Sequence, residues 1–161
     1  MEFKSRYRRK KRIINNMKAV VQRVTEAKLS VGGQLISQIG IGFVVYFGVA
    51  EGDGKEKADF LAKKISGLRV FEDENGKMNL ALKDVGGSVL FVSQFTLIAD
   101  VLKGNRPSFS SAMRPDGANE IYLYCAGKLK EQGLNVQLGV FGADMTIEQK
   151  NQGPVTIIYE V

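Results

Sequence analysis

Two apolar stretches, Ile41–Val49 and Ser88–Val92, place the strongest limit on how this chain can fold. The first reads Ile-Gly-Phe-Val-Val-Tyr-Phe-Gly-Val, a continuous run rich in β-branched and aromatic residues. Continuous apolar runs without polar alternation are typical of strands that are buried on both faces. We therefore expect both stretches to be buried strands.

Helical periodicity predicts two main helices, at Lys55–Ser66 and Pro115–Gln132, each followed by a glycine that ends it, Gly67 or Gly133. Their apolar stripes consist of Ala58, Leu61, Ala62 and Ile65 in the first helix and of Ile121, Tyr124, Cys125 and Leu129 in the second. The only cysteine of the chain, Cys125, lies on such a stripe, so we interpret it as a small core residue and not as a nucleophile.

Shorter apolar stretches predict the other strands. Strands at residues 18–24 and 27–31 lead to Gly32-Gly33, and residues 34–39 return, which favours a hairpin that turns at the two glycines. Further strands are expected at residues 68–71, 88–98, 136–141, 145–147 and 155–161. The pattern predicts a β-rich mixed sheet with two helices, an α/β or α+β fold in one domain spanning residues 17–161.

Charge and composition limit the compartment and the partners. Residues 1–16 hold seven lysines and arginines against one glutamate, whereas the remaining residues carry equal numbers of basic and acidic side chains. This basic extension is a disordered extension, a segment upstream of a true start at Met17, or an electrostatic arm for RNA phosphates. With one cysteine and no apolar run of membrane-spanning length, we expect a cytoplasmic chain without disulfides that does not enter a membrane.

Histidine is absent from the chain. This absence excludes Ser-His-Asp and Cys-His catalysis and removes the commonest zinc ligand, so we expect neither a metal site nor a cofactor. Any hydrolysis must then rely on carboxylates, hydroxyls, backbone amides or a group of the substrate.

Polar residues interrupt the second apolar stretch at Ser93-Gln94-Phe95-Thr96. Buried polar side chains cost free energy unless they find partners, so this interruption indicates either a site at a strand end or a strand with one face in water. Two other segments allow a similar choice. Arg106-Pro107-Ser108-Phe109 is a substrate-contacting loop or an ordinary proline-containing loop, and Gly153-Pro154 is a rigid corner at a pocket or an ordinary turn.

In combination these segments resemble one family. Six segments occur in the order found in D-aminoacyl-tRNA deacylases of the D-tyrosyl-tRNA deacylase type: Met17-Lys-Ala-Val-Val-Gln-Arg-Val, Glu72-Asp-Glu-Asn-Gly-Lys-Met-Asn79, Ser93-Gln94-Phe95-Thr96-Leu97, Arg106-Pro107-Ser108-Phe109, Phe141-Gly-Ala-Asp-Met145 and Asn151-Gln152-Gly153-Pro154-Val155-Thr156. The resemblance extends from Met17 to Val161 and has no reliable counterpart for residues 1–16.

The resemblance implies a compact three-layer α/β domain, a homodimer, and hydrolysis of the ester between a D-amino acid, or glycine, and the 3′ end of a tRNA. It implies that Ser93, Gln94, Phe95 and Thr96 form the catalytic strand end. It further implies a cis Gly153-Pro154 peptide that enters the pocket of the partner subunit and excludes L-amino acids. The other residues expected at the substrate are Arg106, Pro107, Ser108, Phe109 and Met145.

Two other functions remain open from the sequence. One is a non-catalytic RNA-binding module that holds a tRNA end in the same pocket. The other is a deacylase specific for L-aminoacyl-tRNA, in which the Gly153-Pro154 peptide would be trans. Hydrolysis of D-tyrosyl-tRNA, of L-tyrosyl-tRNA or of neither distinguishes the three functions.

Overall fold

The computed structural model describes residues 16–161. The prediction for the basic extension, residues 1–16, therefore lies outside the described residues except for Asn16. The element order is β1 (Lys18–Val31), β2 (Gln34–Ile39), β3 (Gly42–Gly48), α2 (Lys55–Gly67), β4 (Phe71–Glu72), β5 (Met78–Leu80), η1 (Leu82–Val85), β6 (Ser88–Ser93), η2 (Phe95–Leu97), α3 (Pro115–Glu131), β7 (Asn135–Leu138) and β8 (Met145–Glu160).

The sheet is organised around β1. One edge of β1 pairs antiparallel with β3 along residues 18–24 and with β2 along residues 27–31, while β8 pairs antiparallel with β1 over both parts. From β3 the sheet continues in parallel through β6 to β7, so that the strand order is β2-β1-β3-β6-β7. The predicted mixed sheet with two main helices is confirmed.

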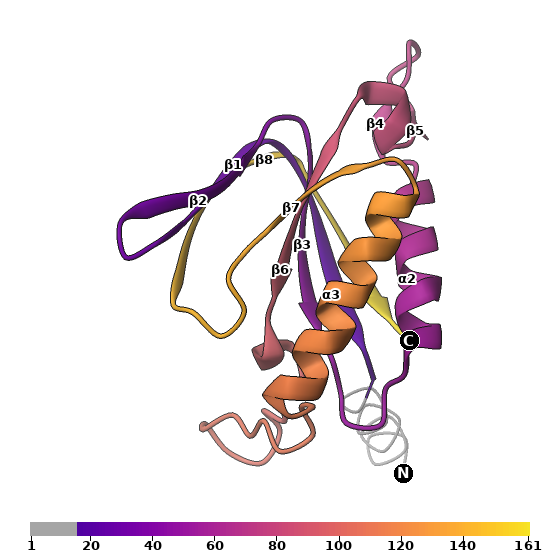
Figure 1. Cartoon of the computed structure of the whole chain (residues 1–161). Coiled ribbons are helices and arrows are strands. Elements are labelled where there is room, and N and C mark those ends of the chain that lie inside the picture. The colour runs from indigo at the N-terminus through magenta and orange to yellow at the C-terminus, as the bar shows by residue number, and fades with distance from the viewer. Residues whose placement is uncertain (1–15) are drawn as a thin grey trace.

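The sheet curls until its two ends meet. Figure 1 shows β2 and the adjoining half of β1 bending away from β3 and β6. The hydroxyl of Ser37 on β2 donates a hydrogen bond to the carbonyl of Leu138 on β7 at 2.5 Å. This contact between the outermost strands makes the sheet nearly a closed barrel.

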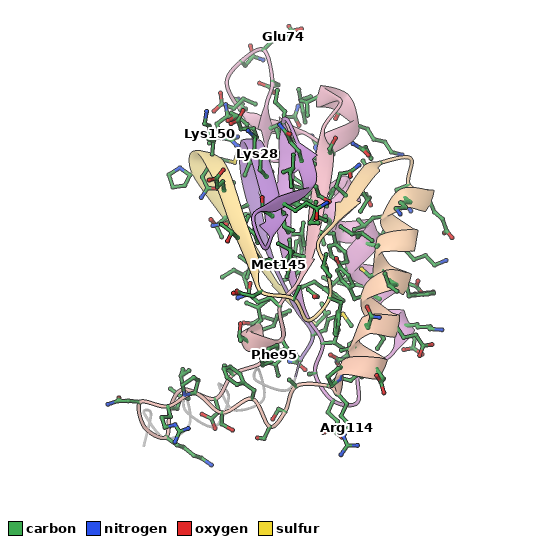
Figure 2. The ribbon with its side chains drawn as sticks, turned by 60° about the vertical axis from the view of Figure 1, so that its left-hand side comes forward. Lys28, Glu74, Phe95, Arg114, Met145 and Lys150 are labelled. Atoms are coloured by element: carbon green, nitrogen blue, oxygen red, sulfur yellow. The ribbon has the colours of Figure 1, made fainter. Side chains whose placement is uncertain are left out.

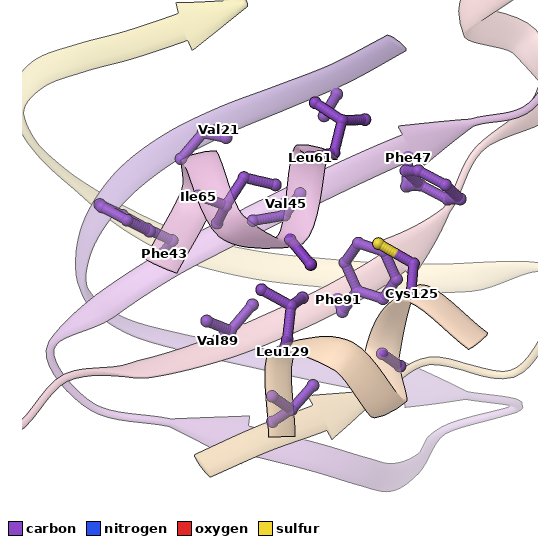
Figure 3. Close-up of a cluster of buried hydrophobic side chains, with 14 of the residues drawn as sticks. Val21, Phe43, Val45, Phe47, Leu61, Ile65, Val89, Phe91, Cys125 and Leu129 are labelled. Carbon is purple, nitrogen blue, oxygen red and sulfur yellow. The ribbon is translucent and has the colours of Figure 1, made fainter. Parts of the chain in front are cut away.

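Both faces of the central strands are apolar, as the continuous run predicted. On β3, Phe43, Val45 and Phe47 belong to the core beneath the helices, whereas Val44 faces the inside of the barrel. The helices α2 and α3 run side by side over the outer face of the sheet (Figure 1). Their inner side chains meet the sheet in one cluster, which contains Leu61, Ile65, Cys125 and Leu129 (Figure 3).

A smaller apolar cluster fills the inside of the barrel. It contains Val24, Ala27, Leu29, Ile39, Val44, Leu90 and Val92, and Met145 and Ile147 of β8 pack against it. The strands β3 and β6 therefore lie between a helical layer and the curled part of the sheet. This arrangement gives the fold its three layers.

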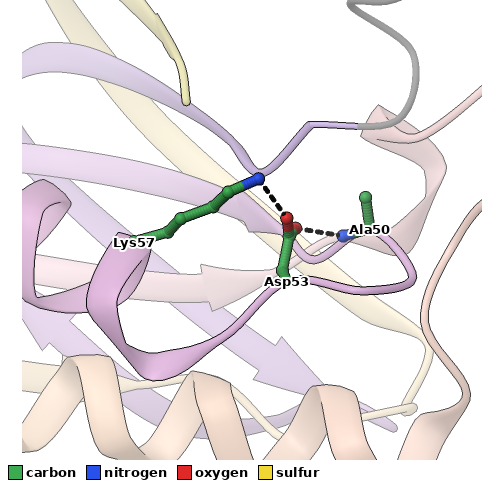
Figure 4. A network of polar contacts seen from close by, with 3 residues as sticks. All are labelled: Ala50, Asp53 and Lys57. Carbon is green, nitrogen blue, oxygen red and sulfur yellow. Dashed lines mark hydrogen bonds and ion pairs between the residues drawn. The ribbon is translucent and has the colours of Figure 1, made fainter.

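A buried carboxylate fixes the connection from β3 to α2. Asp53 accepts hydrogen bonds from the Ala50 backbone N–H at 2.7 Å and from the Lys57 ammonium at 2.6 Å (Figure 4). The Ala50 N–H is thus satisfied inside the protein, which a buried donor requires. Neighbouring backbone hydrogen bonds, from Met113 N–H to Val49 O and from Glu51 N–H to Ser111 O, join the loop before α3 to this end of β3.

Four strand predictions need correction, and one of them is the strand expected at 136–141, which ends at Leu138. The strand expected at 88–98 ends at Ser93, because Leu97 N–H donates to Gln94 O and closes a 3₁₀ turn, η2, in place of the ladder. The strand expected at 68–71 shrinks to β4, a short hairpin with β5. The strands expected at 145–147 and 155–161 form one long strand, β8, because both parts find partners along β1. Neither α2 nor α3 is long and apolar enough to span a membrane.

Candidate active site

The predicted polar strand end is a short turn whose first backbone donors have no acceptor among residues 16–161. The Gln94 N–H donates to Phe47 O at 2.7 Å as the last contact with β3, and the side chain of Gln94 donates to Thr96 Oγ1 at 3.1 Å. In a 3₁₀ turn the first amides have no carbonyl partner within the turn. The first intrahelical donor here is Leu97, so the N–H groups of Phe95 and Thr96 have no acceptor in η2.

A glycine behind the turn lets it pack closely against β3. A Cβ at Gly48 would lie 3.0 Å from both the Gln94 carbonyl oxygen and the Cβ of Leu97. Contacts of this length force a neighbour to move. Gly48 thus allows η2 to lie directly against the end of β3.

The turn borders a cavity of about 790 Å³ between the sheet, the loop before α3 and the start of β8. This size is in the range of small-molecule sites, which are mostly apolar with a few placed polar groups. Six of the predicted site residues line the cavity: Ser93, Gln94, Phe95, Thr96, Phe109 and Met145. Sequence positions that are far apart are therefore brought together as expected.

Two aromatic rings stand at the cavity beside the turn. Phe95 is 57% exposed, and its ring meets that of Phe109 edge to face, with centroids 5.2 Å apart. Figure 2 shows Phe95 below Met145, at the end of the molecule where the loop before α3 extends outward. Exposed aromatic faces are suited to stacking on an unpaired base.

Tyr122 forms the inner wall of the cavity and stays neutral. Its hydroxyl donates to Phe91 O at 2.6 Å, and burial raises the pKa of this phenol to about 12. A phenol with this pKa cannot act as a base near neutral pH. The charged side chains among the lining residues are Arg114 and Asp144.

The loop before α3 holds the remaining predicted loop residues outside the cavity wall. Asp100 and Ser108 exchange two backbone hydrogen bonds, at 2.8 and 2.9 Å, which close the loop into a small hairpin. Arg106, Pro107 and Ser108 are exposed and do not line the cavity. They lie instead on the part of the loop that leads to Phe109. We call this loop before α3, residues 98–114, the arm.

Gly153 and Pro154 lie in an irregular part of β8. Gln22 pairs with Thr156 and Val24 pairs with Asn151, so that residues 152–155 bulge out of the ladder opposite a single residue of β1. The Gly153-Pro154 peptide is cis, and both residues are exposed. Neither residue lines the cavity of its own chain. We call residues 152–155 the corner.

Arg23, which the sequence analysis did not select, holds the corner from beneath. This arginine is only 5% exposed, and it donates from Nε to Gln152 O at 3.1 Å and from Nη1 to Val70 O at 2.7 Å. Its sequence signal was a charge inside a valine-rich strand, where alternation must place either Gln22 or Arg23 on a covered face. A buried charge requires hydrogen-bonded partners, and the corner supplies one of them.

Cys125 is buried and belongs to the core, as the sequence predicted. Burial raises the pKa of its thiol to about 12, and its Sγ contacts Ala58 O at 3.7 Å. Within residues 16–161 no group of three or more Cys, Asp or Glu side chains is arranged to bind a metal ion.

Comparison with known proteins gives consistent results. The family model described as D-Tyr-tRNA(Tyr) deacylase matches residues 20–160. D-aminoacyl-tRNA deacylase of Anaeromyxobacter dehalogenans (strain 2CP-C) is 53% identical over 144 residues, which cover 89% of this chain and 97% of that relative. D-aminoacyl-tRNA deacylase of Thermus aquaticus is 51% identical over 144 residues, which cover 89% of this chain and 95% of that relative.

A solved structure described as c-Myc DNA Unwinding Element Binding Protein has the same fold. It superposes with a TM-score of 0.84 at 43% identity, and the match covers 89% of this chain and 98% of that one. The sequence relatives and the family model agree over almost all of the described residues. The chain belongs to the D-Tyr-tRNA(Tyr) deacylase family.

Proposed function

We propose that this protein hydrolyses the ester bond of D-aminoacyl-tRNA and releases the free D-amino acid and the tRNA. The observation that carries this proposal is the pair of free amides at the start of η2, which border a cavity of suitable size. The names of the relatives support the substrate class. Glycyl-tRNA is the other expected substrate, because a selection against L side chains does not exclude glycine.

We assign the amides of Phe95 and Thr96 to stabilisation of the oxyanion of the tetrahedral intermediate, because both residues line the cavity. One preorganised donor of this kind contributes roughly 10²–10³ to a hydrolysis rate. Ser93 and Gln94 precede these amides on the same strand end and keep the turn in place. Gln94 does so through its hydrogen bond to Thr96.

Activation of water is assigned to the substrate. The chain contains no histidine, and Tyr122 stays protonated because burial raises its pKa to about 12. The 2′-hydroxyl of the terminal ribose lies next to the scissile ester and is present only in RNA. D-tyrosyl-tRNA that ends in 2′-deoxyadenosine should therefore react far more slowly. An unchanged rate would exclude this mechanism.

Selection against L-amino acids is assigned to the corner. Residues 152–155 bulge out of the ladder, Gln152, Gly153 and Pro154 are exposed, and none of these three lines the cavity of its own chain, so they are available to the cavity of a second copy. We therefore propose a homodimer in which Gly153 and Pro154 enter the partner's pocket. There the main chain would leave no room for an L side chain, while a D side chain points outward.

The arm before α3 is assigned to the RNA backbone. Lys103 and Arg106 are exposed on it, and Arg114 lies at the cavity where the arm ends. Lysine and arginine side chains that contact phosphates displace counterions and make binding salt-dependent. Phe95 and Phe109 would then receive the terminal base, and Met145 would contact the aminoacyl end from the opposite wall.

Hydrolysis of D-tyrosyl-tRNA and of L-tyrosyl-tRNA by the purified protein tests the proposed function. The proposal predicts the release of D-tyrosine, with L-tyrosyl-tRNA left intact. Release of L-tyrosine would indicate the L-specific deacylase, and release of neither would indicate the RNA-binding module. Replacement of Pro154 with alanine removes the ring that fixes the backbone and should reduce either the rate or the preference for the D substrate.

A further inference from the structure

Four polar side chains form a connected network between the cavity and the corner. Tyr46 lines the cavity, and its hydroxyl donates to Gln149 Oε1 at 2.6 Å. Gln149 Nε2 then donates to Gln22 Oε1 at 2.8 Å and to Asn151 Oδ1 at 2.6 Å. The network thus links β3, β8 and β1. It uses none of the residues assigned above to the reaction.

Gln149 is the centre of this network. The two N–H bonds of its amide have one acceptor each, and its oxygen accepts from a tyrosine. Burial raises the pKa of Tyr46, so its hydroxyl stays protonated and keeps donating. A side-chain amide with all of these partners is held in one orientation.

Two of the three partners of Gln149, Asn151 and Gln22, belong to the residue pairs that flank the corner. Asn151 pairs with Val24 on one side of the bulge, and Gln22 pairs with Thr156 on the other side. Gln22 Nε2 also reaches Thr156 Oγ1 at 3.5 Å. The network therefore connects the two ends of the corner to each other, in addition to connecting them to the cavity wall.

The network and Arg23 hold the corner from opposite sides of β1. Neighbouring residues of a strand point to opposite faces, so Gln22 and Arg23 lie on different faces. Arg23 holds the main chain at Gln152 from its own face. Without Gln149, the ends of the corner would keep their backbone pairing and the Gln22–Thr156 contact, but they would lose the side-chain link that joins Asn151 to Gln22.

We propose that Gln149 is a positioning residue for the corner. It sets where Gly153 and Pro154 stand and thereby determines how strictly L-aminoacyl-tRNA is excluded. This inference rests on the proposed function, in which the corner selects against L-amino acids. Selectivity would then depend on Gly153 and Pro154 and also on the polar network, which reaches the cavity wall at Tyr46.

The test compares two substitutions of similar size. Gln149→Met removes all three hydrogen bonds. Gln149→Glu keeps the acceptor for Tyr46 and provides acceptors for Gln22 and Asn151 once their amides rotate. The readout is the ratio of kcat/KM for D-tyrosyl-tRNA to that for L-tyrosyl-tRNA. Gln149→Met should lower this ratio about tenfold, equivalent to about 1.4 kcal/mol of discrimination, and Gln149→Glu should restore most of it.

Matched variants separate positioning from general damage. Gln137→Met is the control, because Gln137 also donates to a side chain two residues away on its own strand, Asn135, but contacts no part of the corner. It should leave the ratio unchanged. Tyr46→Phe removes a single hydrogen bond and should lower the ratio less than Gln149→Met does. Thermal unfolding of each variant checks that the fold is retained.

Two outcomes would overturn the inference in distinguishable ways. If Pro154→Ala lowers the ratio while Gln149→Met leaves it unchanged, the corner is the gate but the network does not position it. If Pro154→Ala also leaves the ratio unchanged, the gate itself is refuted and the role of Gln149 with it. Equal losses in the methionine and glutamate variants would also reject positioning through hydrogen bonds.

Discussion

Replacement of Arg23 with methionine should loosen the corner and weaken the fold together. The buried guanidinium donates to Gln152 O in the corner and to Val70 O before β4. Methionine is of similar length and fills the space without either hydrogen bond. Both carbonyl oxygens then lose their charged donor, and the Gln152 main chain loses its support from beneath.

The size of the effect follows from these two contacts. A hydrogen bond from a charged donor contributes about 1.5–3 kcal/mol to stability. The substitution also removes the cost of desolvating a buried charge, and this gain offsets part of the loss. Among residues 16–161 the ion pairs do not include Arg23. We therefore expect a net loss of about 2 kcal/mol, which lowers Tm by about 4–8 °C in a protein of this size.

The assay combines thermal unfolding with hydrolysis of D- and L-tyrosyl-tRNA. Arg23→Met should lower Tm, and it should lower the ratio of D to L hydrolysis by at least about tenfold, the factor that 1.4 kcal/mol gives. Arg23→Lys keeps the charge but not the forked geometry of the guanidinium. Its Tm and its ratio of D to L hydrolysis should lie between those of the wild type and of Arg23→Met. The matched control is Arg69→Met, because Arg69 is exposed and its side chain donates to Asn79, whereas that of Arg23 is buried and donates to the corner. Wild-type Tm and wild-type selectivity in Arg23→Met would refute this reasoning.

Three further predictions concern titration, reactivity and salt. Burial raises the pKa of Tyr122 to about 12, whereas the unfolded chain ionises it near 10. As the pH rises, Tyr122 therefore loses its proton first in the unfolded state, and the free energy of unfolding falls between pH 10 and 12. Measured by urea titration, Tyr122→Phe should reduce this fall by up to about 3 kcal/mol. Because burial raises the pKa of the Cys125 thiol to about 12, intact-mass analysis after iodoacetamide treatment at neutral pH should find no alkylation of the folded protein. Arg106→Gln and Lys103→Gln should each reduce the log–log salt slope of tRNA binding by roughly 0.7–0.9, measured by filter binding; an unchanged slope would remove that side chain from the RNA interface.

The sequence predicted the parts of the fold that depend on local pattern. The continuous run Ile41–Val49 became β3, and the glycines at 32 and 33 became the hairpin turn. Helical periodicity placed both helices within a residue of their observed ends, with Cys125 on the buried stripe. In each of these segments neighbouring residues alone carry enough information, because the spacing of apolar side chains selects the element.

Features that depend on distant partners were harder to predict. Leu97 and Ile98 have the composition of a strand, but Gly48 lets η2 pack against β3 and a 3₁₀ turn forms there. Arg23 acquires its importance only through Gln152 and Val70, which are 129 and 47 positions away in the chain. Pairing of this kind cannot be read from local spacing.

The candidate site shows the same division. Ser93, Gln94, Phe95 and Thr96 were found as a polar interruption of an apolar strand, and they line the cavity together with Phe109 and Met145. Gly153 and Pro154 lie outside that cavity in the single chain, and the role proposed for them requires a second copy. The network around Gln149 had no sequence signal, because glutamines on strands are ordinary surface residues until their partners are known.

The enantiomer released from tRNA charged with a mixture of D- and L-tyrosine is the most direct measure of the central claim. Chiral chromatography of the free amino acid during incubation with the wild-type protein reports both substrates in one tube. The account predicts that D-tyrosine accumulates while the L-tyrosyl ester decays only at its spontaneous rate. Equal release of both enantiomers, or release of L-tyrosine alone, would contradict it.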